Sequence, residues 1–197
     1  KAPCMPDASS AFSFSRASVV DLNPFLFSPK RIFVEEAVVT SALAQRFKKI
    51  FPRIRHNVIS SLKEYQENRR EWGIADYNKR RESVFIVEQR SDYFKPCPCT
   101  LDARGCGYHI FNCGFGCIFE CTYCFLQQYT NTPGIILPAN LDAYFSALAR
   151  TVRTIVRFGT GEFSDSLALD HVTCYSRAII DFFKKYLSAF GSYSITA

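Results

Sequence analysis

Three cysteines near the middle of the chain have a spacing that suits metal chemistry. They form the run Cys117-Ile-Phe-Glu-Cys121-Thr-Tyr-Cys124, with three and then two residues between them. A loop that enters a helix can bring three sulfurs with this spacing to one point. Three thiolates are one fewer than the four ligands of a common cubane iron–sulfur cluster or of a closed zinc site. Three ligands would therefore leave one iron of a cluster with an open coordination position, as chemistry at the metal requires.

The chain has nine cysteines, and four of them closely precede this run: Cys97, Cys99, Cys106 and Cys113. An odd number of cysteines in a chain with a sizeable core favours metal ligation over a disulfide scaffold. One alternative is a structural zinc site that uses Cys113 as its fourth ligand. Another is a second metal site built from the four preceding cysteines, although buried free thiols are the ordinary role of such residues.

Strands and helices alternate along the chain. The apolar patterns predict strands at 31–35, 83–88, 108–112 and 152–158, with the start of another at 193–197. They predict helices at about 41–51, 58–68, 140–150 and 165–187. This alternation is typical of α/β folds with βαβ units and a parallel sheet.

The same patterns suggest how the chain is organised. We expect an N-terminal arm at 1–30, a small N-terminal α/β unit at 31–95, and the start of a larger α/β core at 96–197. A chain that ended inside an apolar strand would leave an open sheet edge. We therefore expect this core to be incomplete and the chain to be a fragment of a longer protein.

The Cys-x3-Cys-x2-Cys run, with Tyr123 just before its last cysteine, resembles the signature of radical S-adenosylmethionine (SAM) enzymes. In that family three cysteines hold a [4Fe-4S] cluster, SAM chelates the fourth iron, and one electron cleaves SAM to a 5′-deoxyadenosyl radical. The resemblance implies that Cys117, Cys121 and Cys124 are metal ligands and that the cofactors are a [4Fe-4S] cluster and SAM. It implies that Tyr123 packs beside the adenine. The implied fold is a partial (β/α)6 barrel, of which this chain holds the first βα units.

A second motif, Gly159-Thr160-Gly161-Glu162, ends the predicted strand at 152–158. It is similar to the Gly-Gly-Glu motif of the same family, in which the glycines admit the methionine part of SAM and a polar group meets its ammonium. The resemblance therefore assigns Gly161 and Glu162 to SAM binding, while Thr160 departs from the double glycine. Alone the motif is weak, because a Gly-Thr-Gly turn is common at the end of a strand.

A closer resemblance is to the spore photoproduct lyase branch of that family. The run 123–127, Tyr-Cys-Phe-Leu-Gln, resembles its Tyr-Cys-Tyr-Leu-Gln, and 164–173 resembles its Ser-Asp-x4-Asp-His-Leu-Thr. Members of the branch repair the thymine dimer of spore DNA, so the resemblance implies a carbon–carbon lyase that acts on a DNA pyrimidine photoproduct. Characterised members return hydrogen to the product radical from a cysteine, and Glu162 stands in its place here. The alternatives are a lyase-like enzyme with another substrate and a metal-binding nucleic-acid module without catalysis.

Composition limits the classes of partner. With 48% hydrophobic residues among 197, the chain is too apolar to be wholly disordered. It has neither an apolar run of the roughly 18 to 20 residues that cross a bilayer nor a secretory signal at its N-terminus, so we expect a cytoplasmic protein without a membrane partner. A radical SAM enzyme also implies an electron donor such as flavodoxin or ferredoxin.

Positive charge is concentrated in one segment. The chain carries a net charge of +6, and residues 46–81 alone hold eleven Lys and Arg against four Asp and Glu. Five aromatic residues are interleaved with these charges: Phe47, Phe51, Tyr65, Trp72 and Tyr77. The segment is compatible with a DNA-binding surface, on which aromatic rings stack with bases. The alternative, and the more ordinary interpretation, is a solvated helical face whose aromatic residues belong to the core.

Overall fold

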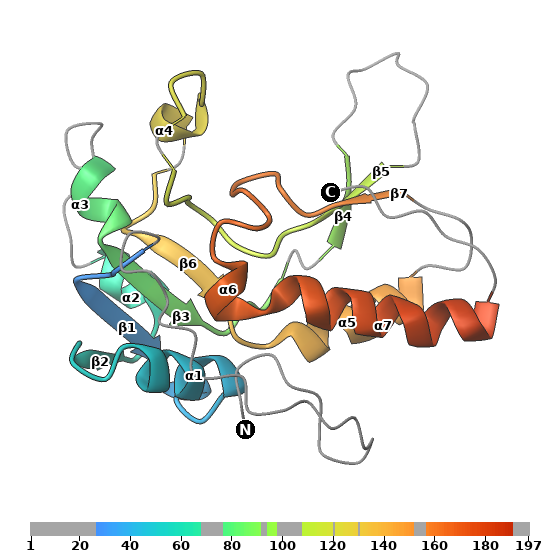
Figure 1. Ribbon diagram of the computed structural model, residues 1–197, viewed down its shortest axis with the longest axis horizontal. Helices are drawn as coiled ribbons and strands as arrows, with labels where there is room; N and C mark the ends of the chain where they lie inside the picture. Colours follow the sequence, from blue (N-terminus) through green and yellow to red (C-terminus); the bar gives the residue numbers. More distant parts are fainter. Residues whose placement is uncertain are drawn as a thin grey trace, which may run out of the picture.

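The computed structural model describes residues 27–67, 77–91, 94–97, 108–119, 121–129, 131–151 and 157–190. Within these ranges the protein is a mixed α/β structure with two separate sheets, shown in Figure 1. Several of our predictions fall outside the described residues, namely most of the arm, Cys99, Cys106, Trp72 and the strand at 193–197.

The first sheet has four parallel strands in the order β2-β1-β3-β6. Its strands are β1 (Arg31–Glu35), β2 (His56–Ile59), β3 (Ser83–Val87) and β6 (Ile135–Pro138). The helices that connect the first three are α1 (Ala42–Ile50), α2 (Leu62–Glu67) and α3 (Tyr77–Arg81), with a short 3-10 turn, η1 (Glu36–Val38), after β1. The predicted strands at 31–35 and 83–88 and the helix near 41–51 are confirmed.

Two parts of the first sheet differ from the prediction. The helix predicted at 58–68 is wrong in its first part, because residues 56–59 pair with β1 as strand β2 and only 62–67 are helical. Pairing along β1 supplies the backbone partners that a local pattern cannot reveal. Strand β6 was not predicted at all, although its Ile-Ile-Leu-Pro sequence is buried at every position. It follows the cysteine run in the chain but completes the sheet of the N-terminal segment.

The second sheet has the order β4-β5-β7 and contains the strands nearest to the predicted site. Its members are β4 (Phe94–Pro96), β5 (Tyr108–Phe111) and β7 (Arg157–Gly159). Strands β5 and β7 are parallel, whereas β4 runs antiparallel to β5 along its other side. The predicted strand at 108–112 is confirmed. The strand predicted at 152–158 is present at 157–159, while 152–156 lie outside the described residues.

The helices of the second half are α4 (Leu126–Tyr129), α5 (Leu141–Thr151), α6 (Asp170–Thr173) and α7 (Tyr175–Phe190). A single helix at 165–187 was predicted, and this is wrong because the chain breaks at Cys174, whose φ of 57° is left-handed. The carboxylate of Asp170 accepts a hydrogen bond of 2.8 Å from the backbone N–H of Ser176. The contact gives one N–H group in the first turn of α7 an acceptor that the helix itself cannot provide, so a new helix can begin after the break.

The core lies between the first sheet and the helices that cover it. One face of this sheet packs against α1, α6 and α7 through the apolar residues Ile32, Val34, Val84, Ile86, Ile135 and Leu137. The opposite face carries Phe33, Phe85 and Ile136 against α2. Helices α5 and α7 run side by side, and the rings of Phe145 and Phe182 stack with their centroids 4.6 Å apart. Both halves of the chain therefore share one core.

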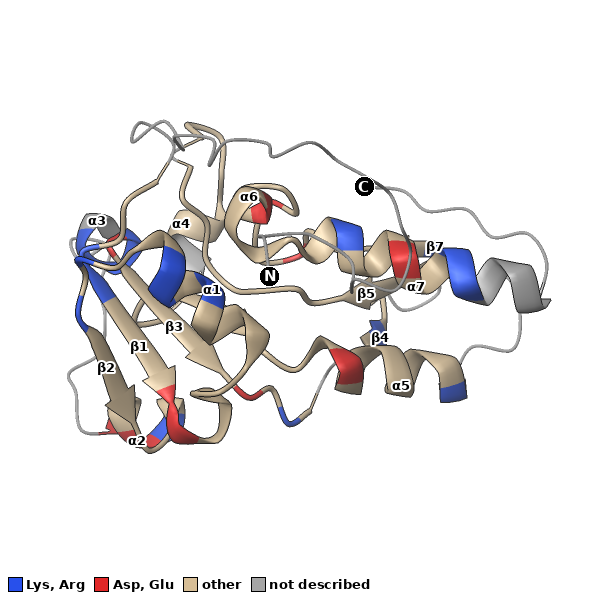
Figure 2. Ribbon diagram, turned by 60° about the horizontal axis from the view of Figure 1, so that its bottom comes forward, with Lys and Arg blue, Asp and Glu red and all other residues tan. Residues whose placement is uncertain are grey.

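The burial of three aromatic residues in the basic segment, 46–81, helps to decide between its two interpretations. Phe47 is fully buried in the core, Phe51 packs against the core, and Tyr65 contacts the rings of Phe33 and Phe85. These three aromatic residues pack in or against the core, as the second interpretation predicted, whereas Trp72 and the side chain of Tyr77 lie outside the described part of the chain. The charges themselves lie outside, and Figure 2 shows Lys and Arg on α1 and where α3 meets the start of β1. No helix in the described ranges is long and apolar enough to span a membrane.

Candidate iron–sulfur site and adjoining pocket

The three predicted cysteine ligands lie on the segment that follows β5, residues 112–125, which we name the cysteine loop. The loop begins beside β6, where Phe115 and Ile136 exchange two backbone hydrogen bonds of 3.0 and 2.9 Å. Gly116 then turns the chain with a φ of +82°, and its N–H donates to the carbonyl of Phe163, 3.0 Å away. Cys117 follows this turn directly. The loop therefore starts from a fixed point at the carboxyl end of a parallel strand, where α/β folds place chemistry.

Cys117, Cys121 and Cys124 are free thiols of intermediate burial. The N–H of Cys124 donates to the carbonyl of Cys121 over 2.9 Å, so these two lie on one turn, and the Phe119 N–H lies 3.5 Å from the Cys117 sulfur. Within the described parts of the chain, no three His, Cys, Asp or Glu side chains are close enough together to hold one metal ion. The structure thus brings the three cysteines onto one loop and does not gather their sulfurs.

The donor set nevertheless fits an iron–sulfur cluster. Cysteine thiolates are the ordinary protein ligands of cubane clusters, and this loop supplies three of them. The loop between them has no regular secondary structure before α4, so it can adjust its backbone when ligands bind. We conclude that the residues present suit a three-cysteine cluster and that ligation requires a local closure of the loop.

The cysteine loop also exposes large aromatic side chains. Phe119, Tyr123 and Phe125 are 45%, 88% and 72% exposed, three of the six large exposed apolar side chains among the described residues. The charge of Cys121 and a hydrogen bond to it raise the pKa of Tyr123. Single exposed apolar residues are ordinary, but three on one short loop indicate a contact surface for a ligand or partner.

The second predicted motif follows β7 and faces the start of the cysteine loop. Glu162 forms an ion pair with Lys95 of β4, with 2.9 Å between Nζ and Oε2. The same ammonium lies 5.2 Å from the ring centroid of Phe163, and that ring stacks on Phe115 at 5.1 Å. A Cβ on Gly161 would lie only 3.1 Å from Ser166 Oγ, so its missing side chain also serves a tight turn. The structure therefore places Gly161 and Glu162 beside the loop that carries the cysteines.

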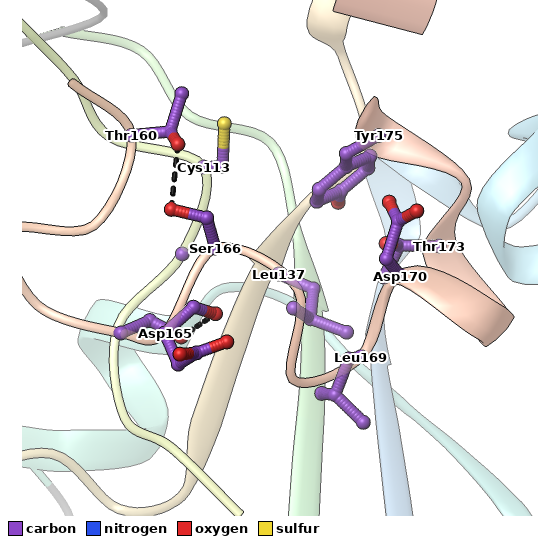
Figure 3. Close-up of a pocket in the computed structure, with 11 residues that line it drawn as sticks. Cys113, Leu137, Thr160, Asp165, Ser166, Leu169, Asp170, Thr173 and Tyr175 are labelled. Carbon is purple, nitrogen blue, oxygen red and sulfur yellow. Dashed lines mark hydrogen bonds between the residues drawn. The ribbon is translucent and has the colours of Figure 1, made fainter. Parts of the chain in front are cut away.

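A pocket lies between β6, the segments after β5 and β7, and the helices α6 and α7, and Figure 3 shows the residues that line it. Its polar lining includes Cys113, Thr160, Ser164, Asp165, Ser166 and Asp170. The Thr160 hydroxyl and the Ser166 hydroxyl are hydrogen-bonded at 2.6 Å. Most of these residues belong to the 164–173 motif, and this motif was the feature of the sequence that pointed to this part of the chain. The pocket itself was missed because Cys113 and Thr160 join it only through the fold.

Cys113 differs from the three cysteines of the run. It is 9% exposed, and burial, reinforced by the nearby charge of Asp170, raises its pKa to about 12. A zinc ligand must be a thiolate, and this environment disfavours that form. Cys174 is disulfide-bonded and so provides no free thiol beside the pocket.

Comparison with known proteins identifies the class of fold. No family model and no curated protein sequence matches the chain. Solved structures do match, and they are structures of spore photoproduct lyase, a radical SAM enzyme. The predicted fold class, an α/β fold that corresponds to part of a radical SAM barrel, is thereby confirmed.

Two of these structures show the extent of the similarity. A double mutant of spore photoproduct lyase with bound AdoMet and dinucleoside spore photoproduct matches with a TM-score of 0.66 and 21% identity, over 86% of this chain and 49% of that one. Spore photoproduct lyase complexed with the dinucleoside alone matches with a TM-score of 0.64 over the same shares. The chain thus spans about half the length of the structures it matches. At this identity the likeness concerns the fold, and it confirms the resemblance seen in the sequence.

Proposed function

We propose that this chain forms part of a radical SAM enzyme of the spore photoproduct lyase kind, which repairs a DNA pyrimidine photoproduct by carbon–carbon bond cleavage. The observation that carries the proposal is the position of the Cys-x3-Cys-x2-Cys run. It leaves the carboxyl end of β5, which is parallel to β7, in a fold that matches spore photoproduct lyase over 86% of the chain. Spacing and position in the fold are independent properties, and both agree with the proposal.

In this proposal Cys117, Cys121 and Cys124 hold a [4Fe-4S] cluster. When bound, the cluster would supply the electron that cleaves SAM to methionine and a 5′-deoxyadenosyl radical, the species that would take hydrogen from the substrate. The three free thiols and the irregular loop that joins them support this assignment. An electron donor such as flavodoxin or ferredoxin completes the requirement for reducing equivalents.

The residues around the cysteines have separate roles in the proposal. Tyr123, which is 88% exposed, packs its ring against the adenine of SAM. Gly161 and Glu162 meet the methionine end, with the carboxylate accepting from the ammonium. Lys95 engages Oε2 of Glu162, and the second carboxylate oxygen can serve the ligand. The contact between the segment after β7 and Gly116 supports this arrangement, because it keeps both groups near the cysteine loop.

The proposed substrate also suggests where the protein acts. DNA is the proposed partner, and the exposed basic residues on α1 and after it, which include Lys48, Lys49, Arg53 and Arg55, offer phosphate contacts. We further propose a cytoplasmic location, where both DNA and a reduced electron donor are present. No residue of the proposed site requires a membrane.

The cofactor assignment can be tested by anaerobic reconstitution with iron and sulfide. We expect about four irons per chain and the visible charge-transfer absorbance of a [4Fe-4S] cluster. Cys121→Ala should lose this absorbance, whereas the matched control Cys97→Ala should keep it, because Cys97 follows β4 and lies outside the run. Stoichiometric zinc in place of iron, or a cluster in Cys121→Ala equal to that of the wild type, would overturn the assignment.

The reaction requires a second experiment with SAM, dithionite and dinucleoside spore photoproduct. We expect 5′-deoxyadenosine and repaired dinucleoside, both measured by chromatography. Formation of 5′-deoxyadenosine without repair would retain the radical SAM assignment and reject this substrate. A wild-type chain that holds the cluster but cleaves no SAM would reject the catalytic role of the chain by itself.

A further inference from the structure

Two arginines of α3 contact backbone carbonyls within and just beyond the cysteine loop, and nothing in the motifs assigns them a role. Arg81 Nη1 donates to the carbonyl of Ile118, 3.0 Å away, and Ile118 is the residue directly after Cys117. Arg80 donates from its two terminal nitrogens to the carbonyls of Gln127 and Thr132, at 3.4 and 3.5 Å. The two guanidinium groups therefore reach the backbone just inside and just beyond the cysteine run.

These contacts connect to the run itself. The side-chain amide of Gln127 donates to the carbonyl of Cys121 over 2.9 Å, so the carbonyl that Arg80 binds belongs to a residue already tied to the second cysteine. The backbone carbonyl of Cys121 in turn accepts a hydrogen bond from the N–H of Cys124. A chain of hydrogen bonds thus runs from Arg80 through Gln127 to the last two cysteines, and a second, direct contact from Arg81 fixes the residue after the first.

The two arginines differ in burial and in the geometry of their contacts. Arg80 is 5% exposed, and two separate nitrogens of its planar fork each reach one carbonyl, a geometry that the single nitrogen of an ammonium does not reproduce. Arg81 is half-buried, and the structure gives it one short contact to the loop. Hydrogen bonds from charged donors are stronger than neutral ones, especially where water is excluded. Both arginines closely precede β3, a strand in which every residue is buried, so their backbone is held firmly.

We propose that Arg80 and Arg81 are positioning residues that hold the cysteine loop so that its three thiols can ligate one cluster. The inference rests on the proposed function, because it explains how an irregular loop keeps a small set of conformations before ligands bind. It adds that the N-terminal segment, through α3, shapes a site whose ligands all come from the second half of the chain. Neither arginine contacts a reacting atom in this proposal.

Amide hydrogen exchange of the iron-free chain tests the anchoring without the cluster. Arg81→Ala should raise the exchange rate of loop amides, the Cys124 N–H among them, by about tenfold, as expected for the loss of one hydrogen bond from a charged donor. Arg81→Lys retains a charged donor for one carbonyl and should restore most of the protection. Arg80→Lys puts one nitrogen where the guanidinium has two, so it should lose the paired geometry and leave the loop as unprotected as Arg80→Ala does. Equal rescue by the two lysines, or unchanged exchange in Arg81→Ala, would overturn the proposal.

Arg46→Ala is the matched control. Arg46 is also a half-buried arginine bound to a backbone carbonyl, that of Thr173 at 2.5 Å, but this bond joins α1 to α6 and does not involve the run at 117–124. Its loss should raise exchange in α1 and α6 and leave the cysteine loop at the wild-type rate. A rise in the loop equal to that of Arg81→Ala would show general destabilisation and would also overturn the proposal.

The reconstituted protein provides the second measurement. Iron should pass to a chelator about tenfold faster from Arg81→Ala than from the wild type, and Arg46→Ala should release it at the wild-type rate. Equal release from all three would show that the anchors do not serve the cluster. A wild type that binds no iron would instead reject the proposed function, while the exchange rates would still report on the anchors.

Discussion

The strand β3 and the cysteine loop lie close together but are stabilised in opposite ways. All five residues of β3 are buried, and Phe85 stacks on Phe33 with ring centroids 4.6 Å apart. The cysteine loop exposes three aromatic side chains and is fixed by hydrogen bonds to Phe163, Ile136 and Arg81. Apolar packing maintains the sheet, whereas a few polar contacts maintain the loop. Changes in the loop should therefore alter ligand binding while the fold persists.

The most direct test of this contrast is to remove one aromatic ring from β3 and one from the cysteine loop. Phe85→Ala deletes a fully buried ring between Phe33 and Tyr65 and should lower the free energy of unfolding by about 3 to 5 kcal/mol. Phe125→Ala, at a side chain that is 72% exposed, should change it by no more than about 0.5 kcal/mol. Urea denaturation measures both. Similar losses from the two variants would show that the loop is part of the cooperative core.

The pH dependence of stability probes the boundary between the two regions. Burial raises the pKa of Cys113 from 9.0 to about 12, so above pH 9 the unfolded chain loses this proton while the folded chain keeps it. The stabilisation is complete below pH 9 and is lost as the pH rises toward 12, at about 1.4 kcal/mol per pH unit at most. Cys113→Ala should remove this contribution to the slope between about pH 9 and pH 10, measured by denaturation at each pH. An unchanged slope would mean that Cys113 titrates normally.

The predictions from sequence succeeded where a structure depends on local pattern. The β-branched and aromatic residues at 83–87 predict a strand wherever they are placed, and β1 and α1 follow from equally local signals. The strand at 56–59 and the break at Cys174 were missed because each depends on a distant partner or on the capping of a second helix. Contacts of this kind have no signature in a single sequence.

The candidate site likewise has features that follow from the local sequence and features that depend on distant partners. The spacing of the three cysteines located the loop, and the resemblance located Gly161 and Glu162 beside it. The anchors could not be predicted, because Arg81 and Ile118 are 37 residues apart and nothing in either sequence context links them. Ligation of one cluster by the three sulfurs requires the cysteine loop to close locally, and the spacing of the cysteines in the sequence does not specify that rearrangement.

A single methyl group added at Gly116, at the turn before Cys117, tests whether this turn fixes the cysteine loop independently of the sheet. Gly116 has a φ of +82°, so Gly116→Ala places a Cβ in left-handed backbone and should cost about 1 to 2 kcal/mol of stability, or reshape the turn before Cys117. We expect the variant to fold, because the sheet is untouched, and to retain less iron after reconstitution than the wild type. Wild-type iron retention together with wild-type stability would show that this turn does not fix the loop.

The smallest effect on stability is expected at the ion pair between Lys95 and Glu162, although the same pair lies where SAM is proposed to bind. The two side chains are 34% and 21% exposed, so Glu162→Gln should lower the free energy of unfolding by less than about 1 kcal/mol. The amide keeps the shape of the carboxylate but removes the charge that an ammonium group requires. SAM binding, measured by calorimetry on the reconstituted protein, should therefore weaken about tenfold or more while urea denaturation hardly changes. Lys95→Met, which removes the competing cation, should leave SAM affinity equal or higher. A loss of affinity in Lys95→Met as large as that in Glu162→Gln would assign the pair to positioning of the loop through Phe163 rather than to the ligand.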